Sequence, residues 1–291
     1  MTRADPVNGG TNILCGVIYE EYAPSPALRP FVDRLWALEA PAGATDADPV
    51  LPDGHVEIIV HAADPFVEIA ADGTRRRQSS VLLAGQLTRA VRLSPTGATL
   101  VAGARLHPNG AHAFFGLRQH LVTDRVVDLT DINARVTRIL RDDLTGRDDR
   151  RQLAAALDRT LCRLAPPTPP ASPVHHVLRL AKQRRGLIQV RDLARAAGVG
   201  DRQLQRAFRD EVGVTPKRLL RVLRFQEVLR RVRGQTDDVR WTEVAAACGF
   251  YDQAHFVHDF RSFTDQAPGA WAIDDASLTA VFSALRRSAT V

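Results

Sequence analysis

The C-terminal third of the chain contains a cluster of arginine and glutamine side chains at helical spacing. On a helix, Arg202, Gln205 and Arg206 share one face, while Leu204 and Phe208 share another at a spacing of four residues. Arginine matches the O6 and N7 acceptors of guanine, and glutamine matches N6 and N7 of adenine. The pattern predicts an amphipathic helix that buries its apolar face and turns base-reading chemistry outward.

The elements that must position these side chains occur twice. The segments 192–216 and 243–268 are similar, with matching positions 51 residues apart before an internal turn and 52 apart after it. A repeat within one small domain indicates duplication of a structural unit. The corresponding pairs are Leu193/Val244, Ala194/Ala245, Gly198/Gly249, Phe208/Phe260 and Pro216/Pro268.

Each repeated unit has the pattern of a helix-turn-helix. A small residue, Ala194 or Ala245, lets a second helix cross the first one closely. Gly198 or Gly249 then ends the first helix, at a position that calls for a positive φ angle. The second helix of each unit is thereby placed to enter a major groove.

The helical period of the C-terminal part predicts helices over 174–183, 190–196, 202–212, 216–233, 241–247, 253–263 and a short one over 268–273. Of these, the helix over Pro216–Arg233 joins the two units. At 1.5 Å per residue it spans ~27 Å, and adjacent major grooves on one face of DNA lie ~34 Å apart. The helix could therefore hold two reading helices in successive grooves. Basic residues around these helices would serve phosphates, and the predicted phosphate contacts are Arg209, Arg218, Arg221 and Arg261.

Residues 174–273 resemble the tandem helix-turn-helix DNA-binding domain of the AraC/XylS family of bacterial transcription regulators. The matching motifs are Leu-x-Arg-x-Phe at 204–208, Gly-x-Thr-Pro at 213–216 and Gly-Phe-x-Asp-x-x-x-Phe at 249–256. The resemblance implies that the first unit reads one half of an asymmetric site and the second unit faces the other half. The residues concerned are Arg202, Gln205 and Arg206 in the first unit, and Gln253, Ala254, Val257 and His258 in the second.

The second unit departs from the family pattern in its reading residues. His258 stands where arginine is common, and Ala254 and Val257 have no hydrogen-bonding side chain, although they could contact thymine methyl groups. We therefore expect the first unit to contribute more of the sequence specificity. Three positions outside the reading residues also differ. Gly200 replaces a helix-capping Ser, which leaves Asp201 to cap instead, while Asp265 replaces a Gly and Ala267 replaces a Ser or Thr.

Charge and proline content divide the chain at the same place. Residues 1–170 carry 19 Lys and Arg against 20 Asp and Glu, whereas residues 171–291 carry 20 against 13. The excess of positive charge in the second part favours a polyanionic partner. Five prolines within residues 165–173 indicate a stiff linker. We predict a sensor or oligomerisation domain over 1–164, a linker over 165–173, the DNA-binding domain over 174–275 and a tail over 276–291.

The predicted fold class is α+β for the N-terminal domain, β-rich with helices at its C-terminal end, followed by an all-α domain with two helix-turn-helix units joined by a central helix. Short apolar runs at 56–60, 81–83, 91–93 and 100–104, separated by turn residues, predict strands, and residues 110–120 and 131–163 predict helices. The motifs Leu51-Pro52-Asp53-Gly54-His55 and Gly103-Ala104-Arg105-Leu106-His107-Pro108 resemble a β-rich domain attached to some AraC-type regulators. By analogy this domain would bind an effector, mediate dimerisation, or both.

The N-terminal histidines have two interpretations. His55, Glu57 and His61 fall on one face of a predicted strand and could contribute to a metal site. We prefer turn and surface histidines beside a buried strand, because no third ligand follows at a fixed spacing. The run Arg75-Arg76-Arg77 is interpreted as a solvated loop, and the aromatic residues expected in the core are Phe31, Trp36, Phe114 and Phe115.

Two alternatives compete with a ligand-modulated regulator. The first is a DNA repair or modification enzyme that uses the same DNA-binding module. It would need an activated thiolate, usually in a metal-held cluster, but Cys15, Cys162 and Cys248 are isolated, and we predict no catalytic residues, no metal and no cofactor. The second is a regulator that responds to a protein partner or acts constitutively. An apolar cavity in the N-terminal domain would favour a ligand, and an exposed apolar patch would favour a partner.

The expected partner is double-stranded DNA, read through the major groove. An effector of unknown identity, RNA polymerase and a second copy of the chain are further candidate partners. No apolar run approaches the ~18 residues of a membrane span, and the first residues lack the apolar segment of a signal peptide. We therefore expect a cytoplasmic protein with no membrane partner.

Overall fold

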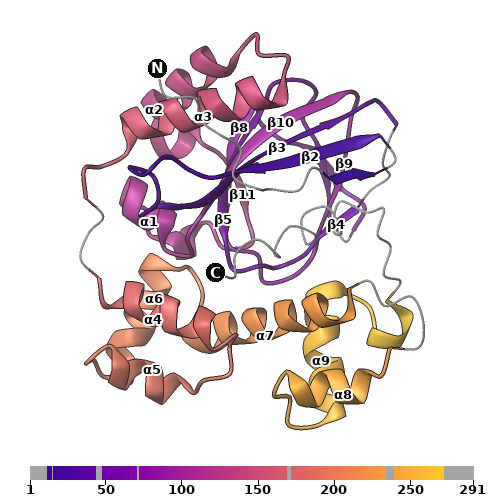
Figure 1. Cartoon of the computed structure of the whole chain (residues 1–291), viewed down its shortest axis with the longest axis vertical. Helices are drawn as coiled ribbons and strands as arrows, with labels where there is room; N and C mark the ends of the chain where they lie inside the picture. The colour runs from indigo at the N-terminus through magenta and orange to yellow at the C-terminus, as the bar shows by residue number, and fades with distance from the viewer. Residues whose placement is uncertain are drawn as a thin grey trace.

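The computed structural model describes residues 12–14, 16–43, 48–70, 72–168, 172–233 and 239–271. A β-rich N-terminal domain lies above a row of helices formed by the C-terminal part (Figure 1). This arrangement confirms the predicted fold class. Within the described ranges, no helix combines the length and apolar character that crossing a bilayer requires.

The larger sheet of the N-terminal domain is antiparallel and has the strand order β1-β2-β3-β10-β5-β8-β11. Its central strands alternate between two faces because successive side chains point to opposite sides of a sheet. Leu35 and Ala37 enter one apolar cluster, whereas Trp36 and Leu38 enter another on the opposite face. The strands are β1 Asn12–Leu14, β2 Val17–Tyr22, β3 Val32–Ala40, β5 Val56–His61, β8 Val81–Ala84, β10 Thr99–Leu106 and β11 Val126–Asp128.

The smaller sheet has four strands in the order β4-β9-β6-β7. Its bounds are β4 Asp48–Val50, β9 Val91–Ser94, β6 Val67–Ile69 and β7 Arg75–Arg77. The run Arg75–Arg77 is therefore an exposed edge strand paired with β6, and the predicted loop at this position was wrong. Three charged side chains at a sheet edge discourage pairing with another chain.

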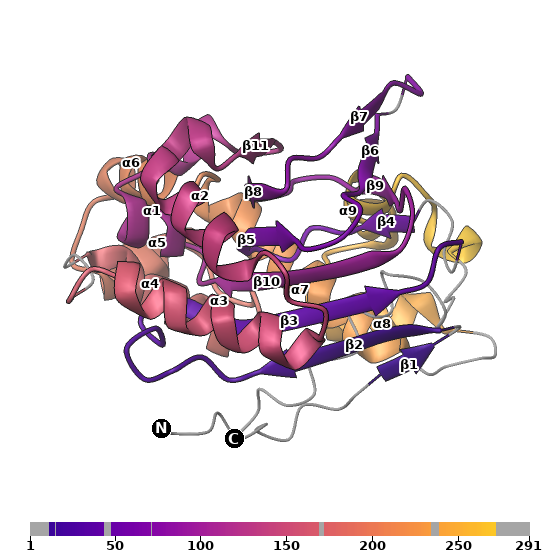
Figure 2. The same cartoon turned by 90° about the horizontal axis from the view of Figure 1, so that it is seen from above.

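Helices cover the face of the larger sheet that points away from the smaller one. In Figure 2, α2 (Thr130–Leu144) and α3 (Arg150–Leu164) lie across this sheet. Leu140, Leu153 and Leu157 pack there against strand residues such as Ile58. The stretch 131–163, predicted to be helical, consists of the two helices α2 and α3 with a turn between them. Asp149 caps the start of α3 by accepting a hydrogen bond from the Gln152 backbone N–H. The preceding helical turns are α1 Gly110–Phe115 and η1 Gln119–Leu121.

The C-terminal part contains the predicted helices in the predicted order. The helices are α4 Pro173–Gln183, α5 Val190–Ala196, α6 Asp201–Glu211, α7 Pro216–Val232, α8 Trp241–Ala247 and α9 Gln253–Thr264. The helix expected after Gln266 is a short 3-10 turn, η2 Pro268–Ala270, and residues 272 and 273 of that prediction lie outside the described residues. Gly198 and Gly249, at the turns of the two units, have φ angles of +65° and +70°, as expected.

The two domains pack against each other along α7 (Figure 1). Leu51 of the N-terminal domain shares an apolar cluster with Val222 and Phe225 of α7. Gln226, also on α7, donates a hydrogen bond to the Pro52 carbonyl. The N-terminal domain is therefore in direct contact with the helix that joins the two units. The predicted linker residues 169–171 and the tail 276–291 lie outside the described residues.

Candidate DNA-binding surface and effector cavity

The first helix-turn-helix unit is built on α5 and α6. Leu193 and Ala194 of α5 are buried against Leu204 and Phe208 of α6. The opposite side of α6 is solvent-exposed and polar, as the spacing requires. Its exposed side chains are Arg202, Gln205, Arg206 and Arg209.

The start of α6 has no side-chain cap. Gly200 occupies the N-cap position with φ −75° and ψ 155°, and Asp201 lies in the first turn without capping the helix. The expectation that Asp201 caps α6 was wrong, because this residue is already helical and a capping side chain must come from the residue before.

The second unit is built on α8 and α9 with a more aromatic core. Phe256, Phe260 and Phe263 of α9 pack with Ala245 and Cys248 at the end of α8. Asp252 caps α9 by accepting a hydrogen bond from the His255 backbone N–H at 2.7 Å. Of the predicted reading residues, Gln253, Ala254 and His258 are exposed and Val257 is half-buried against the core.

Asp259 is a structural residue of the second unit that the sequence analysis missed. Its side chain is 2% exposed and forms a bidentate ion pair with Arg221 of α7, at 2.9 Å from Nε and 2.6 Å from Nη2. By the spacing of 52 residues, its counterpart in the first unit is Ala207. The sequence did offer one sign of this ion pair, because a charged residue stands where the first unit has an alanine on the inner side of the reading helix.

Two of the four arginines predicted to contact phosphates have partners within the chain instead. Arg221 pairs with Asp259, and Arg218 donates to the Thr88 carbonyl while its guanidinium lies 4.8 Å from the ring centre of Phe263. Burial lowers the pKa of Arg218. Its guanidinium hydrogen-bonds to a carbonyl oxygen of the N-terminal domain, where the prediction expected a phosphate oxygen of DNA. Arg209 and Arg261 remain exposed.

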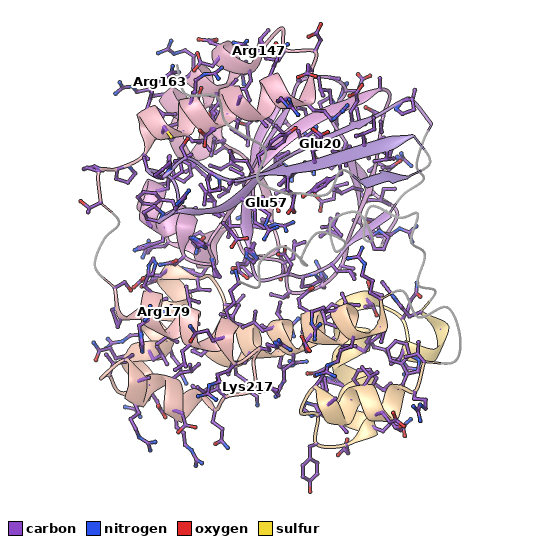
Figure 3. The ribbon with its side chains drawn as sticks, in the orientation of Figure 1. Glu20, Glu57, Arg147, Arg163, Arg179 and Lys217 are labelled. Carbon is purple, nitrogen blue, oxygen red and sulfur yellow. The ribbon has the colours of Figure 1, made fainter. Side chains whose placement is uncertain are left out.

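Two further residues of the helical domain, Lys217 and Tyr251, are exposed. The side of this domain that faces away from the N-terminal domain is the one that carries Lys217, at the start of α7 (Figure 3). Tyr251 is 93% exposed in the turn before α9. Such a large exposed aromatic side chain does not contribute to packing within the chain. Tyr251 was not among the residues predicted to bind DNA.

The N-terminal domain contains a cavity of about 90 Å³ between its two sheets. Its apolar wall includes Trp36, Phe66 and Leu93, and its polar end includes Glu57 and Arg105. The expected aromatic core is confirmed for Phe31 and Phe114, which pack edge-to-face in the main cluster. Phe115 packs half-buried against this cluster, and Trp36 is buried and also lines the cavity.

The preferred interpretation of the histidines as turn and surface residues was wrong in placing the side chains of His55 and His61 at the surface, although His55 does lie in the turn before β5. Burial lowers the pKa of His55 to about 3 and that of His61 to about 4. His61 Nε2 lies 3.1 Å from the Gln78 amide oxygen, and His55 lines the cavity. These side chains are buried because the smaller sheet covers the face of β5 next to them, and the sequence did not indicate this contact between sheets. Within the described residues, no group of three or more His, Cys, Asp or Glu side chains is arranged to hold a metal.

Comparison with known proteins gives separate matches for the two parts of the chain. Residues 20–128 match a domain of unknown function (DUF6597), and residues 193–272 match a helix-turn-helix domain. The transcriptional activators RhaS of Pectobacterium carotovorum and Pectobacterium atrosepticum are each 42% identical over 67 residues, which is 23% of this chain and 23% of theirs. The chain thus spans about a quarter of the length of the curated relatives that it matches.

Solved structures with similar folds include ToxT from Vibrio cholerae. One ToxT structure has a TM-score of 0.43 at 11% identity, covering 77% of this chain and 93% of that one. A second, with bound unsaturated fatty acid, has a TM-score of 0.41 at 13% identity, covering 89% and 95%. The helix-turn-helix match, the RhaS relatives and the two units joined by α7 together support a DNA-binding domain of the AraC/XylS type in the C-terminal part of this chain.

Proposed function

We propose that this protein is a sequence-specific DNA-binding transcription regulator whose DNA binding is modulated by a small molecule in the N-terminal domain. The observation that carries the proposal is the pair of helix-turn-helix units at the two ends of α7, each with an exposed face on its second helix. Such a regulator acts on chromosomal DNA, so we place it in the cytoplasm. RNA polymerase and a second copy of the chain stay predicted partners.

The reading surface is assigned by exposure and chemistry. In the first unit, Arg202, Gln205 and Arg206 have hydrogen-bonding groups free to meet base edges. In the second unit, Ala254 and Val257 can contact thymine methyl groups, while Gln253 and His258 can form hydrogen bonds with base edges.

Phosphate contacts position a protein on the duplex without reading its sequence. Arg209 and Arg261 are exposed and keep this proposed role, and the Tyr251 hydroxyl can serve the same purpose. Arg218 and Arg221 have partners within the chain. We assign these two arginines to holding α7 against the N-terminal domain and α9.

The cavity favours a small-molecule effector over a protein partner as the modulator. It combines apolar walls with a few convergent polar groups, as ligand sites do. The cysteines argue against the alternative of a DNA repair or modification enzyme with a reactive thiolate. Burial raises the pKa of the Cys162 thiol and brings that of Cys248 to about 11, whereas a reactive cysteine needs a depressed pKa. Cys15 lies outside the described residues.

The test is selection of genomic DNA fragments on the purified full-length protein, followed by binding measurements on the enriched sequence. We expect one enriched asymmetric motif and an affinity that falls steeply with salt. Exchanging Arg206 for Ala should weaken binding to this motif. Arg138→Ala, an exposed arginine of α2 remote from both units, is the matched control. Absence of an enriched motif, or binding insensitive to salt, would contradict the proposal.

A further inference from the structure

The cavity of the N-terminal domain is bounded by both sheets and by the DNA-binding domain. Ile59 of β5 and Leu93 of β9 line it from opposite sheets, and Gln226 of α7 also lines it. Glu57, labelled in Figure 3, lies in the lower part of the N-terminal domain, toward α7. A ligand in this cavity would therefore lie next to a residue of the helix that joins the two units.

Among the described residues that line the cavity, its polar end has two carboxylates and one guanidinium. Arg105 is buried, and its Nε lies 2.8 Å from Glu57 Oε1 and 3.6 Å from Asp53 Oδ2. One guanidinium thus faces two carboxylates, all three on residues that line the cavity. Burial raises the pKa of Glu57, and the charge of Asp53 raises it further, while Arg105 opposes both effects. An added cation at this end would relieve the repulsion between the carboxylates.

His55 adds a hydrogen-bond acceptor to the same end. Its Nδ1 lies 3.3 Å from the Asp53 carbonyl oxygen, and a carbonyl can only accept, so Nδ1 carries the proton. The ring is neutral at pH 7 because burial lowers its pKa to about 3. Nε2 is therefore an acceptor, and it is a buried atom without a hydrogen-bond partner among the described residues. Such an atom is costly unless a ligand or water donates to it.

The rest of the cavity wall is largely apolar. Trp36 lies against β10 at Gly103, where a Cβ atom would approach the indole Cε2 to 2.2 Å. Glycine at this position lets the indole lie flat between the sheet and the cavity. With Phe66 it provides an aromatic wall. A cavity of this volume is smaller than the ~150 Å³ that holds benzene in an engineered core, which favours a small ligand.

From these groups we infer that the cavity binds a small amine, with the ammonium group between Asp53 and Glu57, a hydrogen bond donated to His55 Nε2, and the apolar part against Trp36 and Phe66. The inference rests on the proposed function, in that it names the ligand class for the modulating site. A carboxylate ligand would meet two like charges, and a hydrocarbon would leave the His55 acceptor unsatisfied.

The loop 51–55 connects the amine site with α7. Two of its residues, Asp53 and His55, line the cavity, while Leu51 packs against Val222 and Phe225 of α7. Gly54, at φ +82°, lies so near α7 that a Cβ would be 3.2 Å from Leu219 Cδ1. A ligand that fixes this loop therefore also fixes its contact with α7, so occupancy changes the affinity for DNA.

The test measures the melting temperature of the full-length protein with matched probes of one carbon skeleton: isobutylamine, isobutanol and isobutyrate. We expect the amine to raise Tm more than the alcohol, and the carboxylate to have no effect. Glu57→Gln should weaken amine binding about tenfold or more, the loss of one hydrogen bond to a charged group. Glu68→Gln on β6, outside the cavity lining, is the matched control.

A variant that keeps the charges protects the test against misfolding of Glu57→Gln. Ile59→Phe fills the cavity from β5, and it should abolish the amine effect on Tm while the apo protein still unfolds cooperatively. Equal stabilisation by alcohol or carboxylate, no shift with any probe, or amine binding that survives both variants would overturn the inference.

A second measurement separates this inference from the proposed function. The stabilising amine should change the affinity for the selected DNA motif by about fivefold or more, the lower range of coupling between sites. If the protein binds the motif but no amine binds or alters that affinity, the inference fails alone. If no motif is bound at all, the proposed function fails whatever the amines do.

Discussion

The two helix-turn-helix units have the same backbone plan but different surfaces. At corresponding positions of the reading helices, Arg202, Gln205 and Arg206 of α6 are replaced by Ala254, Val257 and His258 of α9. Each unit has a buried phenylalanine at the same position of its second helix, Phe208 in the first unit and Phe260 in the second, and the fold of each unit depends on it. The outward positions are free to vary, so one fold carries a hydrogen-bonding surface in one unit and a largely apolar one in the other.

The units also differ in what supports them. The core of the first unit consists of residues from α4, α5, α6, the α6–α7 turn and the start of α7. The core of the second unit includes Leu51 and Ala90 of the N-terminal domain, and Asp259 ties it to α7. The first unit contacts the N-terminal domain through hydrogen bonds instead, which Gln119 donates to the Glu211 carbonyl and Thr123 donates to the Gly213 carbonyl. Among the described residues, the N-terminal domain therefore contributes side chains to the apolar core of the second unit and not to that of the first.

The largest expected effect is the loss of the ion pair that only the second unit has. Asp259→Ala leaves the partly buried Arg221 without its bidentate partner, and breaking a buried pair in this way costs about 3–5 kcal/mol. Urea unfolding of the full-length protein measures the change. Pairing Asp259→Leu with Arg221→Met should recover most of the loss, since both charges are removed. A cost below ~1 kcal/mol for the single variant would show that the pair behaves as a surface contact.

Shortening Leu51 tests the dependence of the second unit on the N-terminal domain. Leu51→Ala removes a buried side chain from the cluster with Val222 and Phe225, at a cost of about 2–3 kcal/mol. Hydrogen exchange should show lost protection in α8 and α9, with α5 and α6 unchanged. Equal loss in both units would mean that they are supported alike.

Alanine exchanges at matched reading positions test the difference in surface. Arg206→Ala should weaken binding to the selected DNA motif by about 1–3 kcal/mol, the value of a good base contact. His258→Ala should cost less than ~1 kcal/mol. Both residues are exposed, so the folded state should tolerate either change. A larger loss at His258 would reverse the comparison.

The helix starts give the smallest expected difference. Gly200 begins α6 without a side-chain cap, and a Cβ there would meet no atom within 4 Å. Gly200→Asp should stabilise the protein, and Asp252→Gly, which removes the cap of α9, should destabilise it, each by a few tenths of a kcal/mol. Thermal unfolding of the two single variants and their combination measures both. Changes of the same sign would contradict the capping assignment.

The helical domain was predictable because its information is local. The 3.6-residue period, the turn glycines and the repeat fix α5 at Val190–Ala196 and α8 at Trp241–Ala247 exactly as predicted. Strand β3 was not predicted, because a strand buried on both faces shows no alternation. Its burial pattern, with four consecutive buried residues from Leu35 to Leu38, is of this kind.

The contacts between domains were beyond sequence reasoning, since they join residues far apart in the chain. Arg218 reads as a phosphate contact from its charge and position, but the Thr88 carbonyl reaches it from the N-terminal domain. His55 reads as a turn residue because the sequence does not show that the smaller sheet and α7 enclose it. The residue types indicated which side chains can bind DNA or a ligand. Long-range packing decides which of those side chains remain accessible.

The most direct test of the account is a footprint of the full-length protein on the selected DNA motif, taken at single-base resolution. We predict two protected major-groove segments on one face, about one helical turn of ~10 base pairs apart. Arg206→Ala should remove protection from one segment and leave the other in place. A single protected segment, or two on opposite faces of the duplex, would contradict the claim that α7 presents two reading helices to successive grooves.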